Sequence, residues 1–116
     1  MNRRVVITGL GVVAPNGVGL SDFTHAIKNG ISGIKHDSEL ERLQFSCQIA
    51  GKPEISREKQ LEYFTELELR NFNSTGILYG VIAGIDAWKD AGLSLEVYEN
   101  PDWDSGTTFG TGTSGI

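Results

Sequence analysis

Residues 3–17 read RRVVITGLGVVAPNG. Two arginines lead into a run of β-branched residues, which favours a short buried strand over residues 4–8. Gly9 and Gly11 follow the strand, and a turn signal comes at Pro15-Asn16-Gly17. Glycines placed directly after a strand indicate a backbone that turns sharply or approaches another group closely.

The same residues match the dinucleotide-binding pattern G-x-G-x-x-A at Gly9, Gly11 and Ala14. That pattern works because a helix opens at the glycines and its amino end faces the pyrophosphate. Pro15-Asn16-Gly17 would interrupt such a helix within its first turn. No acidic residue is predicted at a strand end about 20 positions later, since Asp37 is expected in a loop. A nucleotide-binding domain therefore remains only an alternative.

Composition limits the classes of protein that the chain can belong to. With 116 residues, 39% of them hydrophobic and 22% charged, it is at most one globular domain. A net charge of −5 argues against nucleic-acid binding, which needs a basic surface. Cys47 is the single cysteine, so no intrachain disulfide can form, and this fits a cytoplasmic protein. No secretory signal is complete, and no apolar run is long enough to span a membrane.

Three helices are predicted. The first covers residues 22–29, with Ser21 as its N-cap and Gly30 as its terminator. Residues 31–55 are expected to be mostly loop, with a strand over residues 45–50. Ser56 is expected to cap a charged helix that runs to about residue 69, and its inward side chains would be Leu61, Phe64 and Leu67.

The third predicted helix, residues 74–91, is apolar on nearly all sides and ends before Gly92. Such a helix is typical of the interior of a larger protein. Glycines recur in it every four residues, at Gly76, Gly80 and Gly84, and would let another backbone pack closely; the alternative is that they are incidental in a surface helix. Residues 105–116 are expected to begin as a strand and to continue as a glycine–threonine loop, which predicts that the chain is a piece of a longer protein.

Four segments, taken in order, resemble the beginning of the β-ketoacyl-acyl-carrier-protein synthase family: residues 3–17, 30–34, 79–93 and 110–115. The resemblance implies an α/β thiolase-like fold, layered αβαβα in the complete enzymes. It also implies that residues 1–116 are the N-terminal portion of the family's N-terminal domain, which is therefore incomplete here.

Members of this family elongate acyl chains in fatty acid or polyketide-type biosynthesis. They load an acyl group onto a cysteine, decarboxylate malonyl-acyl carrier protein and condense the resulting carbanion with the acyl thioester. The resemblance implies acyl carrier protein as a partner, a homodimer or heterodimer of synthase subunits, and neither a cofactor nor a metal. The catalytic cysteine and two histidines of the family fall beyond residue 116, so no catalytic residue is assigned here, and the segment alone is predicted to be inactive.

Two alternatives to a catalytic synthase stay open. One is a non-catalytic partner subunit of the chain-length-factor type, which shares the fold but lacks the nucleophile. The other is an inactive structural or dimerisation fragment.

The resemblance places one residue against substrate. Thr113 falls where the family lines its acyl tunnel, and Gly112 and Ser114 shape the same turn. Side-chain size there would affect how long an acyl chain fits, because each methylene is worth about 0.8 kcal/mol. The alternative is an ordinary tight turn at the end of a strand.

Other reactive side chains are predicted to have no catalytic role. Cys47 is expected on a strand as a structural side chain, without a helix amino end to activate its thiol. His25 and His36 have neither a nearby nucleophile nor metal-ligand spacing, and they are expected to be surface or hydrogen-bonded histidines. The carboxylates of residues 54–68 alternate with basic residues, which is typical of a solvated helix face.

Overall fold

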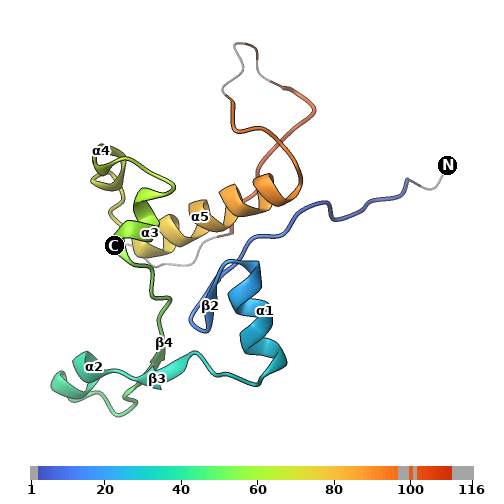
Figure 1. The fold of residues 1–116 in the computed structure, drawn as a ribbon. Helices are drawn as coiled ribbons and strands as arrows, with labels where there is room; N and C mark the ends of the chain where they lie inside the picture. The colour runs from blue at the N-terminus through green and yellow to red at the C-terminus, as the bar shows by residue number, and fades with distance from the viewer. Residues whose placement is uncertain (1–2, 97–99, 101, 111–116) are drawn as a thin grey trace.

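The computed structural model describes residues 3–96, 100 and 102–110. In these residues five helices and two small antiparallel sheets form a mixed α/β arrangement, in which β1 pairs with β2 and β3 pairs with β4. Figure 1 shows the long helix α5 crossing the molecule, with α3 and α4 near its amino end. The elements are β1 (Val13–Ala14), β2 (Gly17–Val18), α1 (Leu20–Lys28), β3 (Ile34–His36), α2 (Ser38–Arg42), β4 (Ile49–Gly51), α3 (Arg57–Leu61), α4 (Glu66–Leu69) and α5 (Thr75–Asp90).

Helix α5 confirms the helix predicted over residues 74–91 and supplies most of the core. Leu78 and Ile82 are buried on one of its faces, together with Leu69 of α4. Gly92 ends the helix with φ 73°, and its N–H donates to the Lys89 carbonyl at 2.9 Å. This positive φ is available to glycine at little cost, so the predicted terminator is confirmed. Partly buried side chains around the core are Val13, Ile55, Tyr63, Phe64 and Phe72.

Helix α1 begins earlier than predicted. Its N-cap is Gly19, not Ser21, and the Phe23 N–H donates to the Gly19 carbonyl at 3.1 Å. The chain leaves β2 directly into the helix because Gly19 adopts φ 90°, a conformation that serine would adopt only with strain. Gly30, with φ 63°, follows the end of the helix as expected.

The prediction of a single helix over residues 56–69 is wrong, because the structure has two short helices there, α3 and α4. Ser56 does cap the first, α3, by accepting from the Lys59 N–H at 3.2 Å. Thr65 then starts α4 through a capping box, in which the Thr65 N–H donates to Glu68 at 2.8 Å. This second start signal, T-x-x-E, interrupts the first helix. Leu61 and Leu67, which were predicted to point inward, are consequently exposed, with 42% and 72% of their surface accessible. Phe64 packs against the core as predicted.

Residues 31–55 are more ordered than predicted. They form an arm in which β3 pairs with β4, and α2 belongs to the connection that joins the two strands along the chain (Figure 1). Asp37 caps α2 by accepting from the N–H groups of Glu39 and Leu40. The predicted strand is displaced toward the carboxyl end, so Cys47 lies in an exposed loop instead of on a strand. The displacement follows from Gln44, whose φ of 57° ends α2 and redirects the chain before β4.

The strand predicted over residues 4–8 is absent. These residues have no regular secondary structure, and Val5 is 93% exposed. A β-strand is defined by ladder hydrogen bonds to a neighbour, and no strand of the described residues pairs with this segment. Residues 105–110, where a second strand was expected to begin, likewise lack regular structure.

The chain buries little of its own surface. Its accessible area is 9715 Å², whereas a compact monomer of the same mass would expose about 6,200 Å². Its radius of gyration is 17.2 Å, against about 13 Å for a compact domain of this length. Only four hydrophobic residues of the described chain are buried, namely Ala26, Leu69, Leu78 and Ile82. The apolar surface left open is therefore large for a self-contained domain.

No helix formed by residues 3–96, 100 and 102–110 has both the length and the apolar character needed to cross a membrane.

Candidate functional site

The glycines of the opening stretch lie against the backbone of α5. A Cβ atom at Gly11 would lie 1.9 Å from the Ala83 carbonyl oxygen, and one at Gly9 would lie 2.2 Å from the Ala87 carbonyl oxygen. Between them, the Leu10 N–H donates to Oδ2 of Asp90 at 2.9 Å. Only glycine permits an approach this close, so helix packing accounts for both glycines.

This packing contradicts the nucleotide-binding alternative. After Gly11 the chain enters β1, reverses at Pro15-Asn16 and returns as β2, and the next helix begins at Leu20. The dinucleotide pattern requires a helix that opens at the glycines and directs its amino end at the phosphates. Here the glycines precede a hairpin and face the side of α5.

A second segment contacts the same helix. The ring of Phe109 lies over two of the three glycines of α5. A Cβ atom at Gly80 would be 3.0 Å from its Cε1, and one at Gly84 would be 3.8 Å from its Cζ. Gly80 and Gly84, which were predicted with Gly76 to let a backbone pack closely, therefore accommodate an aromatic ring. The close backbone approach occurs instead at Ala83 and Ala87.

The residues predicted to line the acyl tunnel, Gly112, Thr113 and Ser114, lie outside the described residues. The described chain reaches Gly110, immediately after Phe109. The contact of Phe109 with α5 is therefore the described feature that lies nearest in sequence to the predicted tunnel residues.

The cysteine, the two histidines and the carboxylates of residues 54–68 do not form a common site in the described residues. Cys47 is exposed, and its Sγ atom is 3.9 Å from the Ile49 carbonyl oxygen. His25 and His36 are exposed, as predicted: His25 contacts Asn29 at 3.4 Å, and His36 lies 3.6 Å from Glu41. The described residues contain no group of three or more His, Cys, Asp or Glu side chains placed to hold a metal ion. The carboxylates of residues 54–68 are solvent-exposed, as predicted for a solvated face.

One polar contact that the sequence analysis did not anticipate ties α5 to the segment between α3 and α4. The Tyr63 hydroxyl donates to the Asp86 carboxylate, at 2.9 Å to Oδ1 and 3.1 Å to Oδ2. The Lys89 ammonium lies 5.2 Å from the centroid of the Tyr63 ring. Burial raises the pKa of Tyr63, and the hydrogen bond to Asp86 raises it further. The sequence signal for this contact is Asp86, an acidic residue within an apolar helix. Its carboxylate joins α5 to the segment between α3 and α4.

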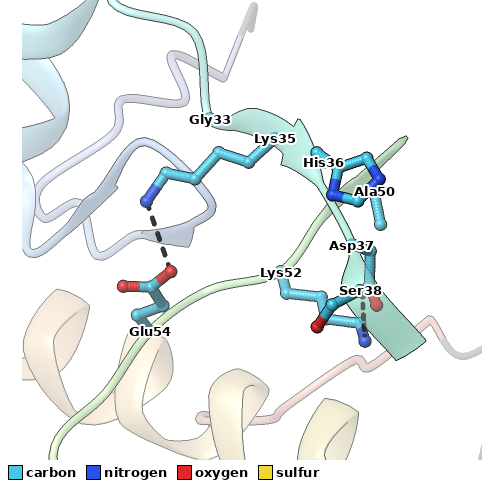
Figure 2. A pocket seen from close by; sticks show the side chains of 8 residues that line it. All are labelled: Gly33, Lys35, His36, Asp37, Ser38, Ala50, Lys52 and Glu54. Carbon is cyan, nitrogen blue, oxygen red and sulfur yellow. Dashed lines mark hydrogen bonds and ion pairs between the residues drawn. The ribbon is translucent and has the colours of Figure 1, made fainter. Parts of the chain in front are cut away.

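The arm contains a polar hollow of about 220 Å³ (Figure 2). Lys52 lies 2.5 Å from Asp37 at one side, and Lys35 lies 3.2 Å from Glu54 at the other. These four charges pair with one another, so they leave no unpaired charge that would select a ligand. The lining residues are Gly33, Lys35, His36, Asp37, Ser38, Ala50, Lys52 and Glu54.

The Asp37 carboxylate makes this arm sensitive to acid. The hydrogen bond from Lys52 and the two amide donors of α2 lower its pKa below the ordinary value of 3.8. A carboxyl group whose pKa is lower in the folded state stabilises that state above its unfolded pKa, and the effect is lost as the pH falls through the folded pKa. We expect the arm to loosen below about pH 4. Asp37→Asn should remove this acid step while keeping the helix cap, because asparagine also caps.

Amide NMR of Glu39 and Leu40 through an acid titration measures this effect. An acid step that persists unchanged in Asp37→Asn would assign it to another group.

Comparisons with known proteins agree with the resemblance. The family model described as "Beta-ketoacyl synthase, N-terminal domain" matches residues 2–115. The 3-oxoacyl-[acyl-carrier-protein] synthase 2 of Coxiella burnetii is 32% identical over 116 residues, which is 98% of this chain and 26% of that protein. The protein of the same name from Vibrio cholerae is 33% identical over 98% of this chain and 26% of its own length. A putative polyketide beta-ketoacyl synthase 1 of Streptomyces halstedii is 30% identical over 99% of this chain and 26% of its own length.

The chain thus spans about a quarter of the length of these curated relatives. The matched residues 2–115 include the hairpin of β1 and β2 as well as α5. This chain therefore belongs to the β-ketoacyl synthase family, within its N-terminal domain.

Proposed function

We propose that the protein carrying this chain is a β-ketoacyl-acyl-carrier-protein synthase, which elongates acyl chains by decarboxylative Claisen condensation in fatty acid or polyketide-type biosynthesis. The observation that carries the proposal is the family match over residues 2–115. Relatives over nearly the whole chain are named for 3-oxoacyl-acyl-carrier-protein and polyketide synthesis. Acyl carrier protein is accordingly the proposed partner, and the cytoplasm the proposed location.

The complete fold is proposed to be thiolase-like and layered αβαβα, with residues 1–116 as the first portion of its N-terminal domain. The large accessible area of the chain and its exposed apolar residues support this proposal, because further layers would cover them. A dimer of synthase subunits is proposed on the basis of the family resemblance alone.

The proposed chemistry divides between this chain and the rest of the protein. A cysteine thiolate beyond residue 116 would take the acyl group, and two histidines there would assist decarboxylation and hold the thioester oxyanion. Loss of carbon dioxide from the malonyl thioester leaves the electron pair on the α-carbon, which attacks the acyl thioester and releases the cysteine. Gly112, Thr113 and Ser114 are proposed to line the acyl tunnel. The described residues of this chain are proposed to supply part of the scaffold of the N-terminal domain.

The test is condensation by the complete protein, using acyl-acyl carrier protein and radiolabelled malonyl-acyl carrier protein. We expect a labelled β-ketoacyl product, and an acyl adduct that mass spectrometry maps to a cysteine beyond Ile116. Cys47→Ser is the matched control and should retain the activity, because Cys47 lies in a loop of the arm. The 116-residue chain alone should form no adduct that turns over.

Two results would overturn the proposal. One is a catalytic acyl adduct on Cys47. The other is a complete protein with no cysteine at the family's nucleophile position, which would favour the non-catalytic chain-length-factor type of subunit.

A further inference from the structure

The chain contains two Asn-Gly sequences, Asn16-Gly17 and Asn29-Gly30. In such a sequence the glycine nitrogen can attack the side-chain amide carbon of the asparagine, because glycine has no Cβ atom to hinder the approach. The attack closes a succinimide ring and expels ammonia, and water then opens the ring to aspartate or isoaspartate. The reaction needs no enzyme and no reactant other than water. The surroundings of each site therefore decide whether it occurs in the folded protein.

The Asn16-Gly17 sequence is enclosed by three elements. It belongs to the hairpin of β1 and β2, in which Gly17 pairs with Ala14. A Cβ atom at Gly17 would lie 2.5 Å from the Phe23 backbone nitrogen of α1. On the side of the arm, a Cβ atom at Gly33 would lie 2.5 Å from the Asn16 backbone nitrogen. Ring closure at Asn16 would thus require the hairpin, α1 and the arm to separate.

The Asn29-Gly30 sequence lies at the open carboxyl end of α1. Both residues are exposed, and apart from its chain neighbours no heavy atom lies within 4 Å of a Cβ position at Gly30. The Gly30 N–H donates to the Ile27 carbonyl at 3.2 Å. The Ile31 N–H donates to the Ala26 carbonyl at 2.8 Å. Opening of a helix end breaks only local bonds of this kind, so the Gly30 nitrogen can reach the Asn29 side chain without wider unfolding.

The face of α1 that carries Asn29 is polar. Asp22, His25 and Asn29 follow helical spacing and are all exposed, whereas Ala26 is buried. A polar helix face normally points to solvent, so we expect Asn29 to stay accessible in the complete protein.

His25 lies beside the nitrogen atom that would leave. Nδ2 of Asn29 donates to the His25 carbonyl at 2.8 Å and lies 3.4 Å from Nδ1 of the His25 ring. As the succinimide ring closes, this nitrogen becomes an amine that must take up a proton before it can leave as ammonia. The imidazole lies within reach to supply that proton as a general acid.

We propose that Asn29-Gly30 is a site of spontaneous modification, at which Asn29 converts to aspartate and isoaspartate and His25 protonates the departing ammonia. The Gly30 nitrogen gives its proton to solvent and bonds to Cγ of Asn29. The Cγ–Nδ2 bond breaks, and Nδ2 leaves with a proton from His25, which solvent then restores. The product places a negative charge at the carboxyl end of α1, where the helix dipole disfavours it. This inference does not depend on the proposed synthase function.

The test is incubation of the complete protein at neutral pH, followed by peptide mass spectrometry that distinguishes asparagine, aspartate and isoaspartate at each position. Asn29 should convert at least about tenfold faster than Asn16, because its ring closure requires less local unfolding. His25→Gln should slow the conversion of Asn29 about tenfold, which is less than the effect of a well-aligned catalytic group. Lys28→Gln, which alters an exposed cation in the same turn of α1, is the matched control and should leave the rate unchanged.

Each part of the proposal has an outcome that would overturn it. Equal conversion at Asn16 and Asn29, or conversion at neither, would overturn the modification site. An unchanged rate in His25→Gln would overturn the role of His25, as would a loss of rate that Lys28→Gln reproduces. Hydrogen exchange at the Gly30 amide should be the same in His25→Gln and the wild type. A change in exchange that matches the change in rate would assign the effect to opening of α1 and overturn the proton transfer.

Discussion

The isolated 116-residue chain is expected to lose its structure gradually on heating, without a sharp cooperative transition. Cooperative unfolding requires a shared core, and only Ala26, Leu69, Leu78 and Ile82 are buried among the described hydrophobic residues. The first of these belongs to α1 and lies outside the cluster that the other three form. Local helices and hairpins can then melt separately.

Exposed apolar side chains strengthen this expectation. Val5 and Ile7 are 93% and 82% exposed, and Trp103 is 89% exposed. Apolar surface of this kind promotes self-association when nothing covers it. The isolated chain should therefore also be poorly soluble.

Scanning calorimetry with circular dichroism measures the transition, and sedimentation measures the association state. The complete protein is the control and should melt cooperatively. A monodisperse monomer of the 116-residue chain, with equal calorimetric and van't Hoff enthalpies, would show that the chain is a self-sufficient domain.

The second large effect is expected for Gly11→Ala in the complete protein. The added Cβ atom would lie 1.9 Å from the Ala83 carbonyl oxygen and 2.6 Å from the Ala87 backbone nitrogen. Both neighbours are backbone atoms of α5, so a rotamer change cannot relieve the clash. The segment must leave the helix or displace it, at a cost of about 3 kcal/mol or more in the free energy of unfolding.

Gly106→Ala is the matched control, because no heavy atom lies within 4 Å of its Cβ position and its φ is not positive. Urea unfolding of the two variants and the wild type gives the comparison. Equal stability of Gly11→Ala and Gly106→Ala would mean that residues 9–11 do not pack on α5 in the complete protein.

Local signals in the sequence predicted the helices best. The apolar character of residues 74–91 on nearly all sides and the terminating Gly92 identified α5, and Ser56 marked the start of α3. These features depend on contacts within a few residues, which a sequence records directly. The T-x-x-E pattern at Thr65 also indicates the break before α4. The prediction missed it because the apolar residues on either side have helical spacing, which favours one continuous helix.

Features that depend on distant partners were predicted less well. Residues 4–8 have the composition of a strand, yet strand formation requires a neighbouring strand, and the described chain provides none. In the arm, the pairing of β3 with β4 joins two short segments whose register depends on the α2 turn between them. Neither segment carries a strong alternating pattern by itself.

The glycine contacts show the same limit. The proline after Gly11 correctly indicated that no phosphate-binding helix opens there, but it gave no information on what Gly9 and Gly11 contact. Their neighbour is the alanine face of α5, more than 70 residues away in the sequence. The glycines at positions 80 and 84 were expected to meet a backbone and instead meet the Phe109 ring, because the partner at each position is set by tertiary packing.

Hydrogen exchange at the Leu10 amide, in the complete protein, tests the central claim most directly. This amide lies between the two glycines and donates to Asp90 on α5. If residues 9–11 are part of the scaffold of a condensing enzyme, the amide is protected without any nucleotide, and adding NAD leaves its exchange rate unchanged. Exchange at the rate of an unstructured peptide, with protection that appears only when NAD is added, would contradict the account.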